Sequence, residues 1–258
     1  MSHVDYSRAA ADYDRHRGAL IPADLARQLA EAAGLRPMSP VLDIGAGTGR
    51  VALALAALGC RVAAADPSFK MLEKLRSKSA GMPIGLVGAL GASLPFRDRS
   101  FEAVVLARIL YLMADWRAAL GEVARLLRPD GYLLHEWSNG SGDEDWVQIR
   151  EKARSLFEEA GIVNPFHPGA RQESEVDQAL AGLGFTVTEE IRAEPDRQIT
   201  LATFLSSIAS GECSYVWSVP ADVQARCLPE LSRWASERFD LDQSFPQEVV
   251  WKVYRATS

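Results

Sequence analysis

The chain has 258 residues, 48% of them hydrophobic and 24% charged, which is typical of a globular protein large enough to bury a full core. Its net charge of −6 argues against nonspecific nucleic-acid binding, which depends on a basic surface. No run approaches the roughly 18 apolar residues of a membrane span, and the N-terminus lacks the apolar region of a signal peptide. Cys60, Cys213 and Cys227 are too far apart for a Cys-x-x-Cys metal site and odd in number for a disulfide framework. We expect a cytoplasmic protein with neither a membrane nor a nucleic acid as partner.

Strands and helices alternate along the first half of the chain. Apolar faces at helical spacing predict helices that begin at Pro22, after Gly49, at Pro67 and at Asp115. This alternation is typical of βαβ units, so it predicts a parallel sheet whose ligand lies beyond the carboxyl ends of the strands. The predicted strands are residues 41–44, 61–65, 84–87, 101–106 and 132–137.

The alternation of strands and helices ends after residue 138, where a Gly/Ser/Asp loop precedes a mostly helical region. The adjacent acids at residues 143–145 are not expected to bind a metal ion, because neighbouring side chains rarely converge. Helices are predicted over residues 146–160, 173–183 and 198–239, and further strands over residues 185–191 and 249–254.

The most informative stretch is residues 41–50, in which an apolar strand ends in an acid and runs into three alternating glycines before a helix. Glycine permits positive φ and lets a ligand approach the backbone closely. The N-terminus of the helix that follows has free N–H groups, which favour an anionic group. Asp66 ends the next strand, where a carboxylate can accept both hydroxyls of a ribose. These features predict a ligand that lies over the glycine turn.

At these positions and several others, the sequence resembles the class I S-adenosylmethionine-dependent methyltransferases, particularly the group that acts on small molecules. The matching segments are residues 13–17, 41–50, 65–68, 94–96, 100–102 and 122–131. The resemblance covers roughly residues 10–137 and implies an α/β fold, a Rossmann-like parallel sheet of about seven strands with an antiparallel last strand, flanked by helices.

The resemblance also implies how the chain is divided. An N-terminal arm and helix would occupy residues 1–36. The cofactor-binding core would comprise residues 37–138, completed by residues 171–193 and 248–258. Residues 139–170 and 194–247 would form a helical cap over the acceptor site.

By the same resemblance, S-adenosyl-L-methionine would lie along the strand ends and leave as S-adenosyl-L-homocysteine. Asp43 and the glycine turn would line its methionine end, Asp66 would hold its ribose, and Met71 or its neighbours would flank its adenine. Many relatives carry an acid for the adenine amino group where this chain has Leu90 and Gly91, which leaves that contact to the backbone. The residues so implied are Tyr13, Arg17, Asp43, Gly45, Ala46, Gly47, Gly49, Asp66, Pro67, Met71, Leu90, Gly91, Ala107 and Arg108.

The acceptor side is less defined. A sulfonium already activates the methyl group, so the protein chiefly has to align a nucleophile behind it, and a base is needed only if the acceptor must lose a proton. Arg108 and Tyr111 follow the fourth strand, in the segment that in the family passes under the methyl group. The candidate bases are His16, His135, Glu136 and His167, and the candidate walls of the acceptor site are Tyr111, Trp137, Trp146, Phe166, Tyr215 and Trp217.

We therefore expect methyl transfer to a small molecule by a monomer or homodimer without a metal ion. Base methylation is disfavoured because residues 107–110 do not resemble the Asn-Pro-Pro-Tyr segment that grips the target amine in related enzymes. One alternative is an NAD-dependent oxidoreductase, although its Gly-x-Gly-x-x-Gly fingerprint would need a glycine where Arg50 stands. Another is a protein that binds S-adenosylmethionine without catalysis. Whether O, N or C accepts the methyl group stays open.

Overall fold

The computed structural model describes residues 20–137, 144–163, 168–193, 198–210, 216, 219–246 and 249–257. The chain forms two compact units. The larger, called the core unit below, comprises residues 5–138, 169–193 and 250–258, and the second unit comprises residues 1–4, 139–168 and 194–249. Within the described ranges, every helix is too short or too polar to cross a membrane.

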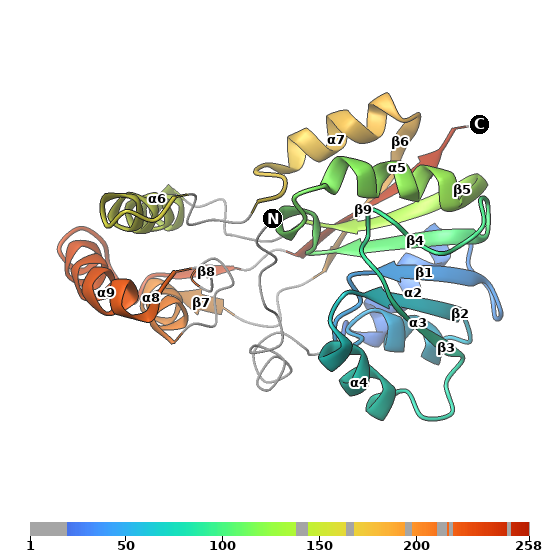
Figure 1. Ribbon diagram of the computed structural model, residues 1–258, viewed down its shortest axis with the longest axis horizontal. Helices are drawn as coiled ribbons and strands as arrows, with labels where there is room; N and C mark the ends of the chain where they lie inside the picture. Colours follow the sequence, from blue (N-terminus) through green and yellow to red (C-terminus); the bar gives the residue numbers. More distant parts are fainter. Residues whose placement is uncertain are drawn as a thin grey trace. The chain divides into compact units, whose positions relative to one another are not determined.

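The core unit is built on one sheet. Its strands are β1 (Pro40–Ile44), β2 (Arg61–Asp66), β3 (Ile84–Gly88), β4 (Phe101–Ala107), β5 (Leu127–Glu136), β6 (Phe185–Ala193) and β9 (Val249–Ala256). They lie in the order β3-β2-β1-β4-β5-β9-β6 (Figure 1). The pairs from β3 through β5 are parallel, whereas β9 runs antiparallel to β5. The predicted fold class, a mostly parallel sheet with an antiparallel last strand, is confirmed.

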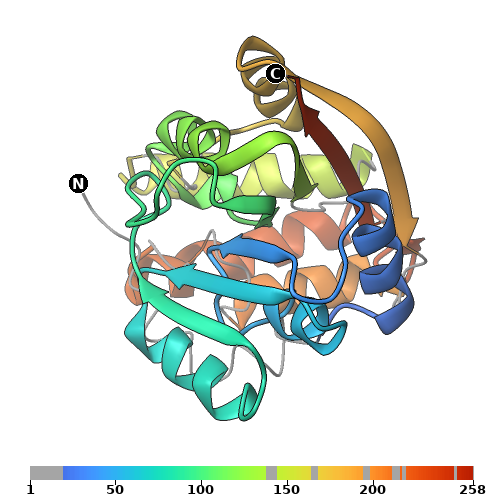
Figure 2. The same ribbon diagram turned by 90° about the vertical axis from the view of Figure 1, so that its right-hand side faces the viewer.

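Helices cover both faces of this sheet. They are α2 (Ala23–Ala32), α3 (Ala52–Ala57), α4 (Phe69–Lys78), α5 (Trp116–Leu126) and α7 (Glu173–Gly182). Helices α5 and α7 lie on one face, and α2, α3 and α4 lie on the other (Figures 1 and 2). The central strands β1 and β4 are buried along nearly their whole length, as is typical of parallel strands covered on both faces.

Strand β5 begins at Leu127, five residues before the predicted start at Tyr132. Its pairing with β4 shifts in register between Phe101 and Ala103, so the turn-like residues Pro129, Asp130 and Gly131 are accommodated inside the strand. Asp130 has φ +61, a left-handed conformation that Asp tolerates better than most residues.

The second unit contains α6 (Glu144–Glu159), α8 (Leu201–Ala209) and α9 (Ala221–Ser236), around an apolar cluster in which the ring of Trp146 stacks on that of Phe204 at 3.6 Å. The predicted helical region over residues 198–239 was wrong at its start. Strand β7 (Gln198–Thr200) pairs with β8 (Ser244–Pro246) in a two-stranded antiparallel sheet. Strands of three residues carry too little periodicity to be recognised in a sequence. That this region covers an acceptor site stays a prediction.

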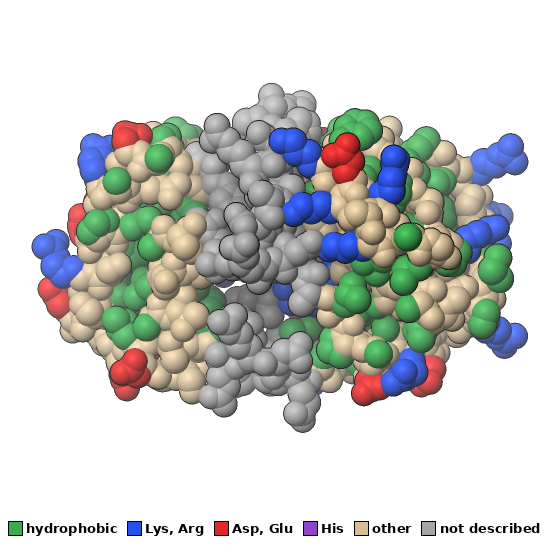
Figure 3. Space-filling model, turned by 90° about the horizontal axis from the view of Figure 1, so that it is seen from below, with side chains coloured by type: hydrophobic (Ala, Val, Ile, Leu, Met, Phe, Trp, Pro, Cys, Tyr) green, Lys and Arg blue, Asp and Glu red, His purple; other side chains and the backbone are tan. Residues whose placement is uncertain are grey.

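Acidic, basic and apolar side chains are interspersed on the drawn face of each unit (Figure 3). The chain as a whole has 28 basic and 34 acidic residues, so its net charge is small.

Candidate functional site

The glycine turn after β1 is bonded to the end of β2. The amides of Gly45 and Ala46 both donate to the Ala65 carbonyl, at 2.8 and 3.1 Å. The Gly47 amide donates to Oδ2 of Asp66 at 2.9 Å. Gly45, Gly47 and Gly49 have φ values of +72, +54 and +96, which other residues rarely adopt. The sequence therefore folds so that the turn and the carboxylate, predicted separately, form one hydrogen-bonded unit.

Asp66 is held in place by the backbone on both of its oxygens. Its Oδ1 accepts the Ser68 amide at 2.8 Å, while Oδ2 accepts Gly47. Burial raises the pKa of this carboxyl, and the two amides oppose the rise. A carboxylate has about four lone-pair positions, so each oxygen can still accept a hydroxyl. The geometry fits the ribose of a nucleoside.

An apolar surface adjoins Asp66. The side chain of Phe69, in the first turn of α4, is 75% exposed, and its ring lies against Gly88 at the end of β3. Leu90, just beyond, is 48% exposed. Met71 is 3% exposed, so it offers little surface to a ligand. Phe69 is the residue that sequence reasoning did not single out, and its position three residues after Asp66 was the available signal.

Asp43 lies beneath the turn and is 2% exposed. Burial, together with the nearby Asp66 carboxylate, raises the pKa of Asp43 to about 7, against the lowering effect of the Ala52 amide. Ala52 N donates to Oδ2 of Asp43 at 3.0 Å. The first amide of the six-residue helix α3 is thus bonded to Asp43, and an anion site at this N-terminus stays a prediction.

The segment after β4 packs onto the turn. A Cβ on Gly45 would lie 2.5 Å from Cγ1 of Ile109, and one on Gly91 would lie 2.7 Å from Cε of Met113. The chain returns to this segment at residue 169, where Gly169 N donates to the Tyr111 carbonyl at 3.0 Å. A Cβ there would lie 2.1 Å from the Leu110 carbonyl oxygen. The glycines thus allow close packing as well as positive φ.

A buried ion-pair triad lies at the ends of β4 and β5. Glu136 is 1% exposed and pairs with two arginines. Its Oε2 lies 2.5 Å from Nη1 of Arg50, and its Oε1 lies 2.6 Å from Nε of Arg108. With both oxygens bonded to guanidinium groups, Glu136 is better suited to orienting the arginines than to accepting a proton.

His135 points to the opposite face of the sheet, where its ring lies between those of Trp137 and Tyr254. Burial is the main cause that lowers its pKa to about 4, so His135 is neutral at pH 7. Among the described residues its Nδ1 has no hydrogen-bond partner. Trp137 and Tyr111 meet edge to face at 6.2 Å.

The remaining predicted residues divide into three groups. Trp146 is 5% exposed in the apolar cluster of the second unit, where it acts in packing. Pro67 is exposed and Ala107 half-buried, each just at a strand end. The predicted residues outside the described ranges are Tyr13, His16, Arg17, Phe166, His167, Tyr215 and Trp217.

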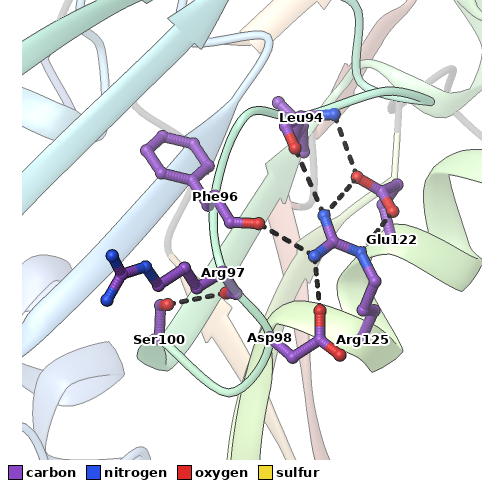
Figure 4. Close-up of polar contacts among 7 residues, drawn as sticks. All are labelled: Leu94, Phe96, Arg97, Asp98, Ser100, Glu122 and Arg125. Atoms are coloured by element: carbon purple, nitrogen blue, oxygen red, sulfur yellow. Dashed lines mark hydrogen bonds and ion pairs between the residues drawn. The ribbon is translucent and has the colours of Figure 1, made fainter.

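The motif residues 94–96 and 122–131 serve structure. Arg125 of α5 donates to the carbonyls of Leu94 and Phe96 and to the carboxylates of Asp98 and Glu122 (Figure 4). Glu122 in turn accepts the Leu94 amide at 2.9 Å. This network fixes the loop that follows Gly91 against α5.

Known proteins are similar to this chain both in sequence and in fold. The family model described as "Methyltransferase domain" matches residues 42–135. An uncharacterized methyltransferase of Mycobacterium tuberculosis is 30% identical over 87% of this chain and 83% of its own length. A demethylmenaquinone methyltransferase of Clavibacter sepedonicus is 37% identical over 50% of this chain and 54% of its own.

The fold has a counterpart among solved structures. The YcgJ protein of Bacillus subtilis aligns over 92% of this chain and 100% of its own, with a TM-score of 0.63 at 21% identity. The extended sequence match to a methyltransferase overturns the nicotinamide-dependent alternative. The chain belongs to the S-adenosylmethionine-dependent methyltransferases.

Proposed function

We propose that this methyltransferase acts on a small-molecule acceptor and binds its cofactor along the ends of β1, β2 and β3. The observation that supports this most directly is the hydrogen bond from Gly47 to Asp66, which joins the glycine turn to the carboxylate expected at the ribose. When bound, S-adenosylmethionine supplies a methyl group already activated by its sulfonium.

The residues around the turn have distinct tasks in this proposal. Asp66 accepts the ribose hydroxyls, and the exposed faces of Phe69 and Leu90 flank the adenine. Asp43 places a second acid beside the turn, which suits a ligand with two cationic groups. Ile109 and Met113 pack against Gly45 and Gly91 and exclude water from this edge.

Positioning, rather than acid–base chemistry, supplies the rate in this proposal. Both carboxylate oxygens of Glu136 are paired with arginines, and His135 is buried on the other face of the sheet. Well-oriented intramolecular reactions show that alignment alone can lower a barrier by roughly 7–11 kcal/mol. A general base therefore enters only for acceptors that must lose a proton.

The experiment has two steps. Isothermal titration calorimetry compares S-adenosylhomocysteine with NAD, and we expect binding of the first and not of the second. Methyl transfer is then followed as S-adenosylhomocysteine formation with a panel of small acceptors, beginning with demethylmenaquinone because one relative carries that activity in its name. Absence of S-adenosylhomocysteine binding would refute the cofactor site, and transfer only to a nucleic acid or protein would refute the small-molecule acceptor.

A further inference from the structure

We propose that Arg50 and Arg108, held by Glu136, form a binding site for the carboxylate of an acid that serves as methyl acceptor. This inference rests on the proposed function, since it assigns the acceptor class of the same site.

The triad carries more positive charge than its own pairing requires. One arginine would neutralise the buried Glu136, yet two contact it, which leaves one net positive charge. The side chains of Arg50 and Arg108 are 19% and 25% exposed, so this charge is neither fully buried nor fully solvated. A partly desolvated cation attracts an anion more strongly than one in bulk water does.

Hydrogen-bond donors remain for a ligand. A guanidinium has five N–H groups, and within the described part of the chain Arg108 uses only Nε, on Glu136. Its two terminal amino groups stay available as a planar fork, the geometry that binds a carboxylate through both oxygens. Arg50 bonds Glu136 through both terminal nitrogens, so it chiefly fixes the carboxylate that orients Arg108.

The backbone of Arg108 is strained in a way that places this fork. Its φ of +56 is unusual for a residue with a long side chain, and its amide donates to the Glu136 carbonyl at 2.9 Å. Backbone strain of this kind destabilises a folded protein by roughly as much as one hydrogen bond stabilises it. Strained residues are concentrated at binding sites.

The position of the arginines in the sheet favours the acceptor, rather than the nucleoside of the cofactor, as their ligand. Asp66 ends β2 and Glu136 ends β5, three strand spacings apart in the sheet order, which corresponds to about 14 Å at ~4.8 Å per strand. Trp137 follows His135 by two residues and its ring contacts that of His135, on the face opposite Glu136, so the site is defined by the arginines alone.

The test uses benzoate and its neutral isostere benzamide. Both are titrated by calorimetry into the full-length protein saturated with S-adenosylhomocysteine. Wild type is expected to bind benzoate at least about tenfold more tightly than benzamide, as a charge-assisted hydrogen-bond pair predicts. The preference should vanish in Arg108→Gln and persist in part in Arg108→Lys. Arg128→Gln, which breaks an exposed pair with Glu102 at the other end of β4, is the matched control and should keep it.

The outcomes separate the possible sources of the anion. Equal binding of benzoate and benzamide by wild type, which needs no variant to fold, overturns the inference while S-adenosylhomocysteine binding leaves the proposed function standing. A loss of S-adenosylhomocysteine affinity in Arg108→Gln, without a matching loss for its decarboxylated analogue, assigns the arginines to the cofactor carboxylate and also overturns it. Failure of wild type to bind S-adenosylhomocysteine refutes the proposed function instead.

Discussion

The two ends of the strand edge in the core unit differ in charge and in how they are held. At β1 and β2, the carboxylates of Asp43 and Asp66 are hydrogen-bonded to backbone amides of the glycine turn and of the helix starts. At β4 and β5, the carboxylate of Glu136 is bonded instead to the side chains of Arg50 and Arg108.

This difference separates what is general from what is particular. Backbone donors do not change when side chains are substituted, so a site built on them suits the ligand that all members of a family share. A site built on side chains can change its charge and shape through single substitutions. This difference is consistent with our two proposals, which assign the acidic end to the common cofactor and the basic end to the acceptor.

The largest expected effect comes from adding a side chain to the turn itself. Gly49→Ala would place a Cβ 2.3 Å from Cδ1 of Leu75 at φ +96, and we expect a loss of about 2–4 kcal/mol in the free energy of unfolding from strain and overpacking. Urea denaturation measures it. Gly121→Ala in α5, where the Cβ meets open space, is the control and should stabilise slightly. Equal stability of the two variants would show that the turn is not rigid.

The second-largest effect is expected from removal of the Asp66 carboxylate at the end of β2, which should weaken cofactor binding. Asp66→Ala loses the ribose acceptor and the anchor of Gly47, so we expect the affinity for S-adenosylhomocysteine to fall by about 1.5–3 kcal/mol, typical of hydrogen bonds to a charged group. Calorimetry on the folded variant measures the change. Asp66→Asn, which keeps one acceptor oxygen, should lose less. Unchanged affinity in a folded Asp66→Ala protein would remove the ribose contact from the proposal.

The acidic end should also respond to pH through Asp43. Its pKa of about 7 predicts that the carboxyl is mostly protonated at pH 6 and ionised at pH 8, so binding of the cationic S-adenosylmethionine should tighten about tenfold over that range. The sign for stability is opposite. A folded-state pKa above the unfolded value means that the contribution of Asp43 to stability is present below pH 4 and is lost as pH rises to about 7.

Asp43→Asn keeps an acceptor for the Ala52 amide and removes the titration. Its affinity for S-adenosylmethionine should be flat between pH 6 and pH 8. A wild-type profile as flat as that of the variant would dissociate Asp43 from cofactor binding.

The smallest effects on stability are expected for arginines that lie neither at the ends of β1 and β2 nor at the ends of β4 and β5. Arg125→Ala leaves the carbonyls of Leu94 and Phe96 without their side-chain donor, and we expect a loss of about 1–2 kcal/mol in unfolding free energy. Arg128→Ala removes only an exposed pair and should cost less than about 0.5 kcal/mol. If the two variants unfold at the same urea concentration, the network in Figure 4 does not stabilise the loop.

The sheet and the glycine turn could be predicted from the sequence because both depend on local patterns. Apolar runs mark the strands, and the alternating glycines mark a backbone that must adopt positive φ. Alternation along one strand also explains why His135 and Glu136 lie on opposite faces, as their different surroundings show.

The features that could not be predicted from the sequence depend on residues far apart in the chain. The pairing of Arg50 with Glu136 joins positions 86 residues apart, and nothing in the sequence near either residue indicates it. Whether a carboxylate is a base or a counterion is decided by such neighbours. The exposure of Phe69, and the burial of Met71 two residues later, likewise follow from the packing of α4 on the sheet.

The return of the chain at Gly169 has a consequence for how such proteins diversify. The polypeptide leaves the sheet after Glu136 and is bonded again at Gly169 to the carbonyl of Tyr111, so both junctions of the intervening segment lie beside the ends of β4 and β5. A segment of another length or sequence can therefore be inserted between these junctions without altering the strand order. Variation of this kind leaves the glycine turn at the end of β1 unchanged.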